Sequence, residues 1–424
     1  MAFRFVHTAD IHLDSPLRSL ALRDRALGDL IGTATRTAFV RIVDLCLDEA
    51  VDALLIAGDL YDGDQTSMKT ARFLAQQLGR LDAAGVAVFM IRGNHDALSR
   101  ITRELVLPAS VTVFGARAGV RIIEKGGRPV AIHGISFGRP QAPDSLLERF
   151  LPPVPGAVNI GMLHTSLAGA PGHDPYAPCA LTDLQATGFD YWALGHVHQR
   201  AVYPGRALVV MPGMPQGRDI GEAGEKSVTL VTVADDGTLR EECRTTAVAQ
   251  FERVEVAAAG LIDWRDLVAA LGAALRAARR DHGADHLVLR PVLTGATPLA
   301  WRLLRDLDLL QAEAVAVAEG LGSVWIDKLE NHCRAGEGAV SAGPLADLAA
   351  LIDTGALAHP AVTGAAAEVT TDLLRALPRD LRALLGDTPE ATGAACAALL
   401  REGAAEVLAR LAEGEGGQDA DRPA

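Results

Sequence analysis

The segment VAVFMIRGNHD, residues 86–96, decides the fold of the first half of the chain. Its opening run is apolar, β-branched or aromatic up to Arg92, which is typical of a buried strand. The run then meets GNHD at residues 93–96, which does not continue a core. In open α/β sheets, ligands bind at the carboxyl ends of strands, where loops carry functional side chains. The segment predicts a strand that delivers an amide and an imidazole to such an edge, although an ordinary Asn/Asp turn would look the same in isolation.

Two earlier segments repeat this arrangement. Residues 3–8 form a strand-like run that closes on ADIH at 9–12, and DALLIA at 52–57 ends in GDLYD at 58–62. Between these runs, apolar residues recur at the helical period over residues 36–50 and again over residues 73–81. Three strands separated by helical crossovers describe a βαβαβ unit with a largely parallel sheet. The polar side chains at the three strand ends should therefore converge at one edge.

A second set of shorter strands follows from residue 111. The predicted strands cover residues 111–114, 130–133, 158–163, 189–194, 207–211 and 227–233. Two of them end in histidine, at His164 and at GHVH in residues 195–198. The number of strands fits a sandwich of two sheets covered by helices.

Beyond residue 250 the pattern predicts a small α/β domain followed by a helical region. Helices are expected over residues 261–280 and 298–311, and strands over 286–293 and 323–327. The chain is rich in Ala and Leu from residue 344, with an apolar stripe that is either intramolecular core or a partner-docking face: Cys396, Leu399, Leu400, Val407 and Leu411. We therefore predict a catalytic domain at 1–250, an α/β capping domain at 251–340, a helical region at 341–412 and a disordered polar tail at 413–424.

The composition indicates a globular protein of more than one domain. Of 424 residues, 49% are hydrophobic and 22% charged, and the length suffices for two or three domains. A net charge of −13 excludes a general basic nucleic-acid footprint, so a nucleic-acid substrate would need a local patch or a partner's surface. Neither a membrane span nor a signal peptide is expected. The five cysteines form no CxxC pair, which favours reduced thiols in a cytoplasmic protein.

The polar residues at the strand ends form a candidate metal constellation. Its members are Asp10, His12, Asp59, Asn94, His95, His164, His196 and His198. Asp, Asn and His without Cys suit a hard or borderline cation such as Mn²⁺, Fe²⁺ or Zn²⁺. There are too many ligands for one ion, and two ions about 3.5–4 Å apart need a shared carboxylate, for which Asp59 on the central strand is the natural bridge. Such a pair activates water and polarises a phosphoryl oxygen, and a histidine can protonate the departing oxygen.

The order and spacing of these residues resemble the calcineurin-like metallophosphoesterase superfamily. The motifs are Asp10-x-His12, Gly58-Asp59, GNHD at 93–96, His164 and Gly195-His196-x-His198. HTADIHLD at 7–14 with GDLYD at 58–62 resembles DNA-repair nucleases of the SbcD type. VAIHGISFGR at 130–139, HTS at 164–166 and YAPC at 176–179 look closest to bacterial YhaO-like exonuclease family proteins. The superfamily resemblance covers about residues 3–235 and implies an α/β/β/α sandwich; the YhaO-like one extends more weakly through residues 289–298 and 325–327.

The resemblance also implies roles for individual residues. It places Asp10, His12, Asp59 and His198 on a first metal, and Asp59, Asn94, His164 and His196 on a second. His95 is then the acid that assists the leaving group, and Asp96 is a candidate for orienting it. Some relatives have a histidine near the active site where this chain has Asp62, which puts any substrate-placing role of that position in doubt.

Two further residues are candidate substrate contacts. His133 could lie near the substrate or be a strand-end histidine with a backbone partner. Arg139 could meet a phosphate or be a solvated loop arginine. His173 lies in a loop rich in Pro and Gly and receives no role.

The resemblance implies a two-metal phosphodiesterase that acts on DNA, expected to be an exonuclease in DNA repair that uses Mn²⁺, with Fe²⁺ or Zn²⁺ as alternatives. Residues 251–340 would shape access to the site, and the helical end would meet an SMC-like coiled-coil ATPase. A homodimer is a separate candidate assembly. Two other functions stay open: hydrolysis of small substrates such as cyclic nucleotides, and a metal-binding scaffold for the ATPase partner. The sequence leaves exo or endo cleavage and strand polarity undecided.

Overall fold

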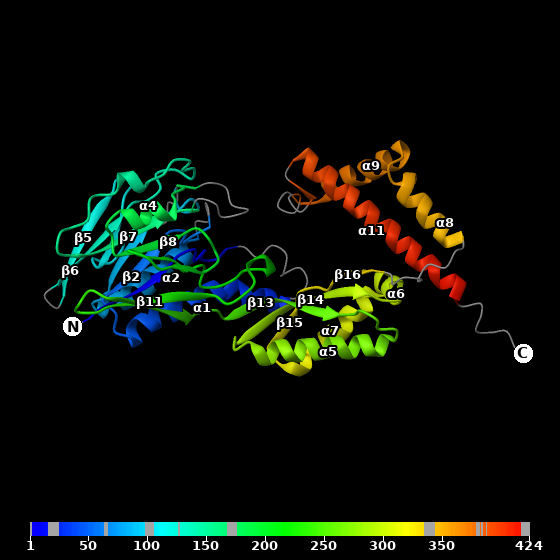
Figure 1. Ribbon diagram of the computed structural model, residues 1–424, viewed down its shortest axis with the longest axis horizontal. Coiled ribbons are helices and arrows are strands. Elements are labelled where there is room, and N and C mark those ends of the chain that lie inside the picture. The colour runs from blue at the N-terminus through cyan, green and yellow to red at the C-terminus, as the bar shows by residue number, and fades with distance from the viewer. Residues whose placement is uncertain are drawn as a thin grey trace, which may run out of the picture. The chain divides into compact units, whose positions relative to one another are not determined.

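The computed structural model describes residues 2–15, 25–62, 67–97, 106–125, 128–167, 176–334, 344–378 and 388–416, with residues 382, 385 and 386 (Figure 1). The chain divides into two compact units. The first comprises Met1–Phe251 with Ala284–His286, and the second Glu252–Gly283 with Leu287–Ala424. Each unit has its own apolar core, so each is described by itself.

The first unit contains a six-stranded sheet with the order β12-β11-β1-β2-β3-β4. Its strands are β1 (Phe3–Thr8), β2 (Ala53–Ala57), β3 (Ala87–Ile91), β4 (Val111–Val113), β11 (Ser227–Val233) and β12 (Leu239–Thr245). The four strands β1 to β4 pair in parallel, β11 pairs with β1, and β12 pairs with β11, both in antiparallel fashion. The predicted βαβαβ unit is therefore present, and the ends of β1, β2 and β3 lie at one edge.

A second six-stranded sheet has the order β5-β6-β7-β8-β10-β9. Its strands are β5 (Gly119–Lys125), β6 (Arg128–Gly134), β7 (Val158–His164), β8 (Tyr191–Gly195), β9 (Ala201–Tyr203) and β10 (Leu208–Met211). The central strands β6, β7, β8 and β10 are parallel, and the edge strands β5 and β9 are antiparallel to their neighbours. The ends of β7 and β8 can thus supply side chains to one place.

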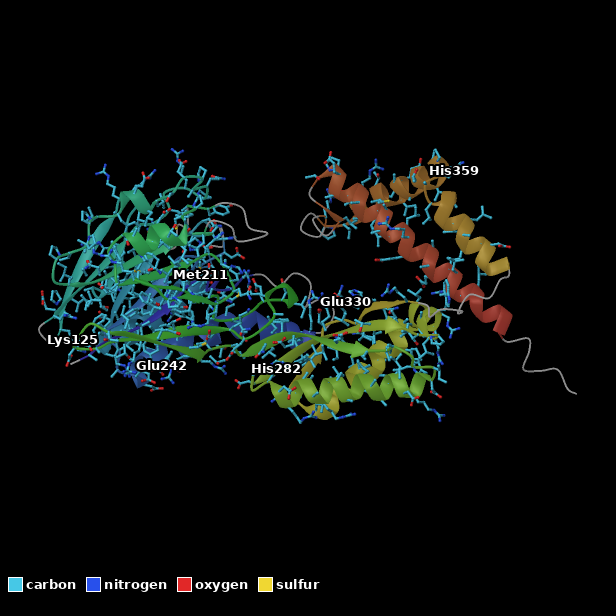
Figure 2. The ribbon with its side chains drawn as sticks, in the orientation of Figure 1. Lys125, Met211, Glu242, His282, Glu330 and His359 are labelled. Atoms are coloured by element: carbon cyan, nitrogen blue, oxygen red, sulfur yellow. The ribbon has the colours of Figure 1, made fainter. Side chains whose placement is uncertain are left out.

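Alternate residues of the strands pack on different layers. In β2, Leu54 and Ile56 belong to the core that includes the helices α1 (Arg25–Asp48) and α2 (Met68–Ala83). Leu55 of the same strand belongs to the core shared with β6, β7 and β8. The outer face of the second sheet packs on a short helix, α4 (Leu181–Ala186), and loops; Met211, labelled in Figure 2, is buried there. This alternation confirms the α/β/β/α sandwich.

Several elements differ from the predicted ones. α1 begins at Arg25 rather than residue 36, because Leu27 and Ile31 extend its buried face across Gly28 and a second glycine. β5, β9 and β12 were not predicted from the sequence. They are edge strands, and β12 (LREECRT) has no apolar run because all seven of its residues are exposed or half-buried.

The second unit begins with a four-stranded sheet. Its strands are β13 (Ala249–Ala257), which runs across the unit boundary, β14 (His286–Ala296), β15 (Val324–Ile326) and β16 (Glu330–Arg334). The helices α5 (Trp264–Asp281), α6 (Ala300–Arg305) and α7 (Leu307–Leu321) contribute to one core with β14. The single helix predicted over residues 298–311 is wrong: the chain leaves helical geometry at Asp306 (φ −112°, ψ 28°), whose carboxylate binds the side chains of Arg302 and Arg305.

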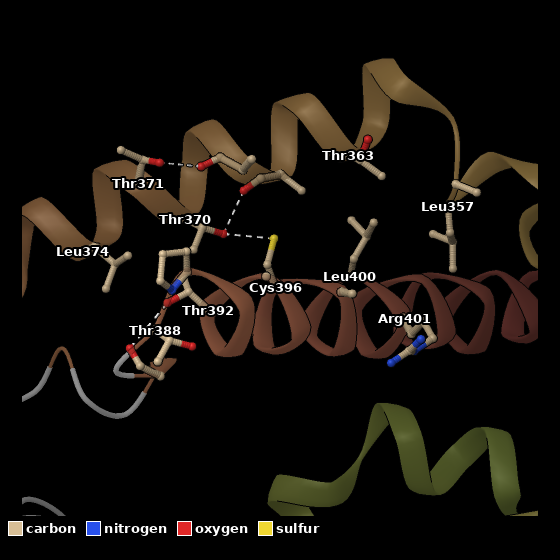
Figure 3. Close-up of a pocket in the computed structure, with 17 residues that line it drawn as sticks. Leu357, Thr363, Thr370, Thr371, Leu374, Thr388, Thr392, Cys396, Leu400 and Arg401 are labelled. Carbon is tan, nitrogen blue, oxygen red and sulfur yellow. Dashed lines mark hydrogen bonds between the residues drawn. The ribbon is translucent and has the colours of Figure 1, made fainter.

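Helices also form the end of the second unit. They are α8 (Pro344–Leu351), a π-helical segment (Ile352–Ala356), α9 (Pro360–Ala376) and α11 (Pro389–Gly416). α9 and α11 line a groove of about 840 Å³, in which Thr370 of α9 donates to the Cys396 thiol of α11 at 3.2 Å (Figure 3). The helix α11 continues to Gly416, so the predicted tail at 413–424 is helical at its start, and residues 417–424 lie outside the described residues.

The predicted apolar stripe of α11 is not a continuous core face. Leu399, Val407 and Leu411 are 51%, 54% and 49% exposed. The buried residues are instead Leu408 and Ala409. The interpretation as intramolecular core is therefore wrong for the three exposed residues. Among the described residues, no helix combines the length and the apolar character that crossing a membrane requires.

Candidate metal centre

Five strand ends from the two sheets of the first unit meet at the candidate site. The residues after β1, β2 and β3 include Asp10, His12, Asp59 and Asn94; β7 ends at His164, and His196 and His198 follow β8. In the described structure, three groups have potential ligand atoms within 4.8 Å of one another: Asp10 with His12 and His198, Asp59 with His164 and His196, and His12 with Asp62 and His95. The predicted convergence of strand ends is present.

The first group contains two imidazoles whose Nε2 atoms lie close together. Nε2 of His12 and Nε2 of His198 lie 3.3 Å apart. The Asp10 carboxylate is fully buried and accepts from the backbone N–H of His196 at 2.9 and 3.1 Å. Burial lowers the pKa of His12 to about 3, so its ring is neutral at pH 7 and can donate a lone pair.

Next to the second group lies Asn94, and acceptor atoms of Asp59, Asn94 and His164 come close together. His164 donates from Nδ1 to the carbonyl oxygen of Ala57 at 2.9 Å, which directs the Nε2 lone pair into the site. That Nε2 lies 3.1 Å from Oδ1 of Asn94 and 3.3 Å from Oδ2 of Asp59. Nδ1 of His196 lies 3.3 Å from the same Asn94 oxygen. Acceptors arranged in this way need a cation or an additional proton between them.

The electrostatics of the second group fit a cation. Burial lowers the pKa of His164, but the carboxylates of Asp59 and Asp10 outweigh burial and raise it to about 9. In the metal-free protein a proton can therefore occupy the position between His164 and Asp59, and a bound cation would displace it. Buried carboxylates are paired or bind metals, and oxygen and imidazole donors without sulfur suit Mn²⁺, Fe²⁺ or Zn²⁺. The residues fit a two-metal centre.

Four of the candidate ligands have a strained backbone. The φ angles of Asp10, His12, Asp59 and His196 are 52°, 46°, 51° and 103°, in the region that residues other than glycine rarely adopt. The segments after β1 and β2 are held side by side by backbone hydrogen bonds from Asp10 to Gly58 (3.0 Å) and from His12 to Asp59 (3.1 Å). Such strain persists only where the surrounding structure over-determines it, and it clusters at functional sites.

His95 differs from the ligands because its side chain is 43% exposed. Its Nδ1 donates to Oδ1 of Asp62 at 2.8 Å, and this hydrogen bond raises the pKa of His95. The structure therefore corrects the expectation that Asp96 orients this ring. The Asp96 carboxylate is buried and accepts from the backbone N–H groups of Gly93 (2.6 Å) and Leu60 (3.0 Å), so it ties the loops after β2 and β3 together.

Three functional candidates were not found from the sequence. The resemblance marks Asp62 only as a departure from relatives. Glu222 accepts from Nδ1 of His198 at 2.9 Å, and Arg218 contacts both Glu222 and Asp62. Arg218 and Glu222 lie in GRDIGE at residues 217–222, a Gly-containing loop after β10. Because this loop is not the end of a strand, a search for polar residues at strand ends does not find them.

The two predicted substrate contacts, His133 and Arg139, lie in different surroundings. His133 is buried: its Nε2 lies 3.1 Å from Oδ1 of Asn159, and its ring packs 4.7 Å from that of Phe189. His133 is therefore a core residue, and its partner is a side-chain amide rather than the backbone. Arg139 is exposed in the loop after β6, and its substrate role stays a prediction. His173 lies outside the described residues.

Gly93 lies in close contact with two candidate ligands, which leads to a prediction. A Cβ added at Gly93 would lie 2.2 Å from Oδ1 of Asp59 and 2.7 Å from Nε2 of His164. Gly93→Ala should therefore displace both side chains and lower the affinity for Mn²⁺ by about tenfold or more, as loss of a ligand's supporting contacts does. Isothermal titration calorimetry measures this affinity. Gly79→Ala on α2, where a Cβ meets nothing within 4 Å, is the control; equal affinity of both variants would contradict the assignment.

Comparison with known proteins gives two family matches. Residues 3–200 match the family described as calcineurin-like phosphoesterase, and residues 251–334 match the middle domain of metallophosphoesterase YhaO. A Bacillus subtilis protein named uncharacterized metallophosphoesterase YhaO is 36% identical over 234 residues, which cover 54% of this chain and 57% of the relative.

Two further relatives are named DNA double-strand break repair protein Mre11. The protein from Sulfurisphaera tokodaii is 26% identical over 223 residues, 50% of this chain and 54% of the relative. The protein from Methanopyrus kandleri is 25% identical over 430 residues, 91% of this chain and 85% of the relative. The matches to the Bacillus and Sulfurisphaera proteins thus span little more than half the length of each relative.

Proposed function

Because the chain carries a calcineurin-like metallophosphoesterase domain over residues 3–200, we propose that it is a two-metal phosphodiesterase that cleaves DNA, as an exonuclease in DNA repair. The observation that carries the proposal is the pairing of a buried carboxylate–imidazole constellation with one exposed histidine, His95, held by Asp62. Similarity to relatives named Mre11 supports DNA as the substrate.

We assign the ligands to two ions, with Asp59 shared between them. Asp10, His12 and His198 would hold one ion, and Asn94, His164 and His196 the other. When bound, the ions would lower the pKa of water and offset the charge of the phosphoryl group. The donor set supports Mn²⁺, with Fe²⁺ or Zn²⁺ as alternatives.

His95 is the residue that we propose to protonate the departing oxygen. Its Nδ1–H is donated to Asp62, which leaves Nε2 as the nitrogen that exchanges a proton with substrate. The exposure of the ring allows contact with a substrate, whereas the buried rings of His12 and His164 do not. Protonation by a positioned side chain contributes about 10²–10⁴-fold to a rate.

The acidic charge and the helical region support a partner. At a net charge of −13 the chain offers no general surface for a duplex, so we propose that a coiled-coil ATPase supplies it. Exposed Leu399, Val407 and Leu411 on α11 are candidate contacts for this ATPase or, as an alternative, for a second copy.

The five cysteines are free thiols, which supports a cytoplasmic location.

Assays on duplex DNA and on cyclic nucleotides test the proposed function. With Mn²⁺, the purified protein should degrade end-labelled duplex DNA from its ends. It should lose this activity in EDTA and regain it when Mn²⁺ is restored, because the bound cations, and not the buried carboxylates themselves, activate water and the phosphoryl group. Product lengths on sequencing gels distinguish end-directed from internal cleavage. Turnover of cyclic nucleotides without cleavage of DNA would favour the small-substrate alternative. Metal binding without any turnover would favour the scaffold.

A further inference from the structure

Arg218 lies between two carboxylates next to the candidate centre. Its Nε is 3.2 Å from each oxygen of Glu222, and its Nη2 donates to the same carboxylate at 2.5 Å. Its Nη1 lies 3.5 Å from Oδ2 of Asp62 and 3.1 Å from Oγ of Ser15, which itself donates to Asp62 at 2.6 Å. The Arg218 side chain is only 19% exposed, so one guanidinium contacts both acidic groups within the protein.

Each of the two carboxylates holds one imidazole of the site. Glu222 accepts from Nδ1 of His198 at 2.9 Å, and Asp62 accepts from Nδ1 of His95 at 2.8 Å. In both rings the donation from Nδ1 fixes the tautomer and leaves Nε2 for function. His198 belongs to the proposed metal ligands and His95 is the proposed acid, so the chain of contacts from Glu222 through Arg218 to Asp62 joins the two parts of the site.

We propose that Arg218 is a positioning residue of this phosphoesterase site, which holds His198 through Glu222 and His95 through Asp62. The proposal rests on the proposed function, because it takes His198 as a ligand and His95 as the proton donor. A guanidinium is suited to this task, since its planar fork bonds two carboxylates at once and its charge offsets theirs. Without it, the two anions would lose their common cation, and each imidazole would lose a fixed partner.

The test uses Arg218→Met in the full chain. The variant keeps the length of the side chain and removes its fork and charge. Its affinity for Mn²⁺, measured by calorimetry, should fall by about tenfold, the lower end of the range for losing an outer-shell partner of a metal ligand. Its cleavage of DNA should also fall more than its cleavage of bis-p-nitrophenyl phosphate, because p-nitrophenolate departs without a proton from His95 whereas a sugar oxygen requires one.

Arg4→Met is the matched control. Arg4 lies in β1 and makes a comparable contact to Glu49 at 2.6 Å, with side-chain exposure of 30%. Its removal should leave both the Mn²⁺ affinity and the ratio of the two activities unchanged. Arg218→Lys, which keeps the charge but not the fork, should fall between wild type and Arg218→Met in both measurements.

Wild-type Mn²⁺ affinity in a folded Arg218→Met protein would overturn the proposal, as would an equal loss of both activities. If Arg218→Met does not fold, the same two criteria apply to Arg218→Lys. A wild-type protein that binds Mn²⁺ but cleaves no phosphodiester would overturn the proposed function instead. In that case the calorimetric comparison of wild type, Arg218→Met and Arg4→Met still decides whether Arg218 supports the metal ligand.

Discussion

Replacing Asp59 with asparagine should reduce phosphodiester hydrolysis by on the order of 10³-fold or more. The proposed ions share this carboxylate, and such ions contribute several kcal/mol of transition-state stabilisation, at about 1.4 kcal/mol for each factor of ten. Asparagine can still accept the hydrogen bond that Oδ1 receives from the backbone N–H of His95 at 3.0 Å, but it cannot supply a bridging negative charge. Initial rates with saturating Mn²⁺ and the metal content per chain measure the effect.

Asparagine is a better probe than alanine at this position because Asp59 has a φ of 51°. Asparagine tolerates the left-handed region, so the substitution adds no backbone strain, and a thermal melt without metal separates lost activity from unfolding. Asp52→Asn is the control: this aspartate lies just before the other end of β2, where it accepts from the backbone of Arg4 at 2.9 Å and pairs with Lys125, labelled in Figure 2. An Asp59→Asn protein with two bound metals and full activity would refute the bridge.

The strand-end residues were predictable because their positions follow from a simple rule. Asp59 and Asn94 lie two and three residues after the short apolar strands β2 and β3, and parallel strands place such ends at one edge of a sheet. The α/β/β/α sandwich follows from the same pattern of strands and crossovers. Edge strands such as β12 escaped prediction because half-exposed strands lack an apolar run, and the helix break at Asp306 depends on local side-chain contacts with arginines.

The rule that polar residues at strand ends converge could not predict the supporting residues Arg218 and Glu222. Glu222 is 24 residues from His198 in the chain, and Arg218 is 156 residues from Asp62. Neither lies at the end of a strand that carries a ligand, so only the folded loops bring them together. Asp96 illustrates the same limit: the family resemblance made it a candidate for orienting His95, but its carboxylate accepts from the backbone N–H groups of Gly93 and Leu60.

His95→Asn should lower DNA cleavage by about 10²–10⁴-fold while both metals still bind. The asparagine amide can replace Nδ1–H as the donor to Asp62, so the substitution removes chiefly the Nε2 position that would hand a proton to the departing oxygen. Cleavage of bis-p-nitrophenyl phosphate should change far less, because p-nitrophenolate is a stable anion at neutral pH. The two rate constants, measured on the same preparation, give the comparison.

The selectivity of the loss is what distinguishes an acid from a structural residue. If His95 only supported the fold or the metals, DNA and the activated substrate would be affected in proportion, and the metal content would fall. His332→Asn in β16, an exposed histidine in the second unit, controls for the loss of an imidazole and should leave both rates unchanged. Equal losses on the two substrates in His95→Asn would assign the leaving-group proton to another donor and leave His95 with a role in positioning alone.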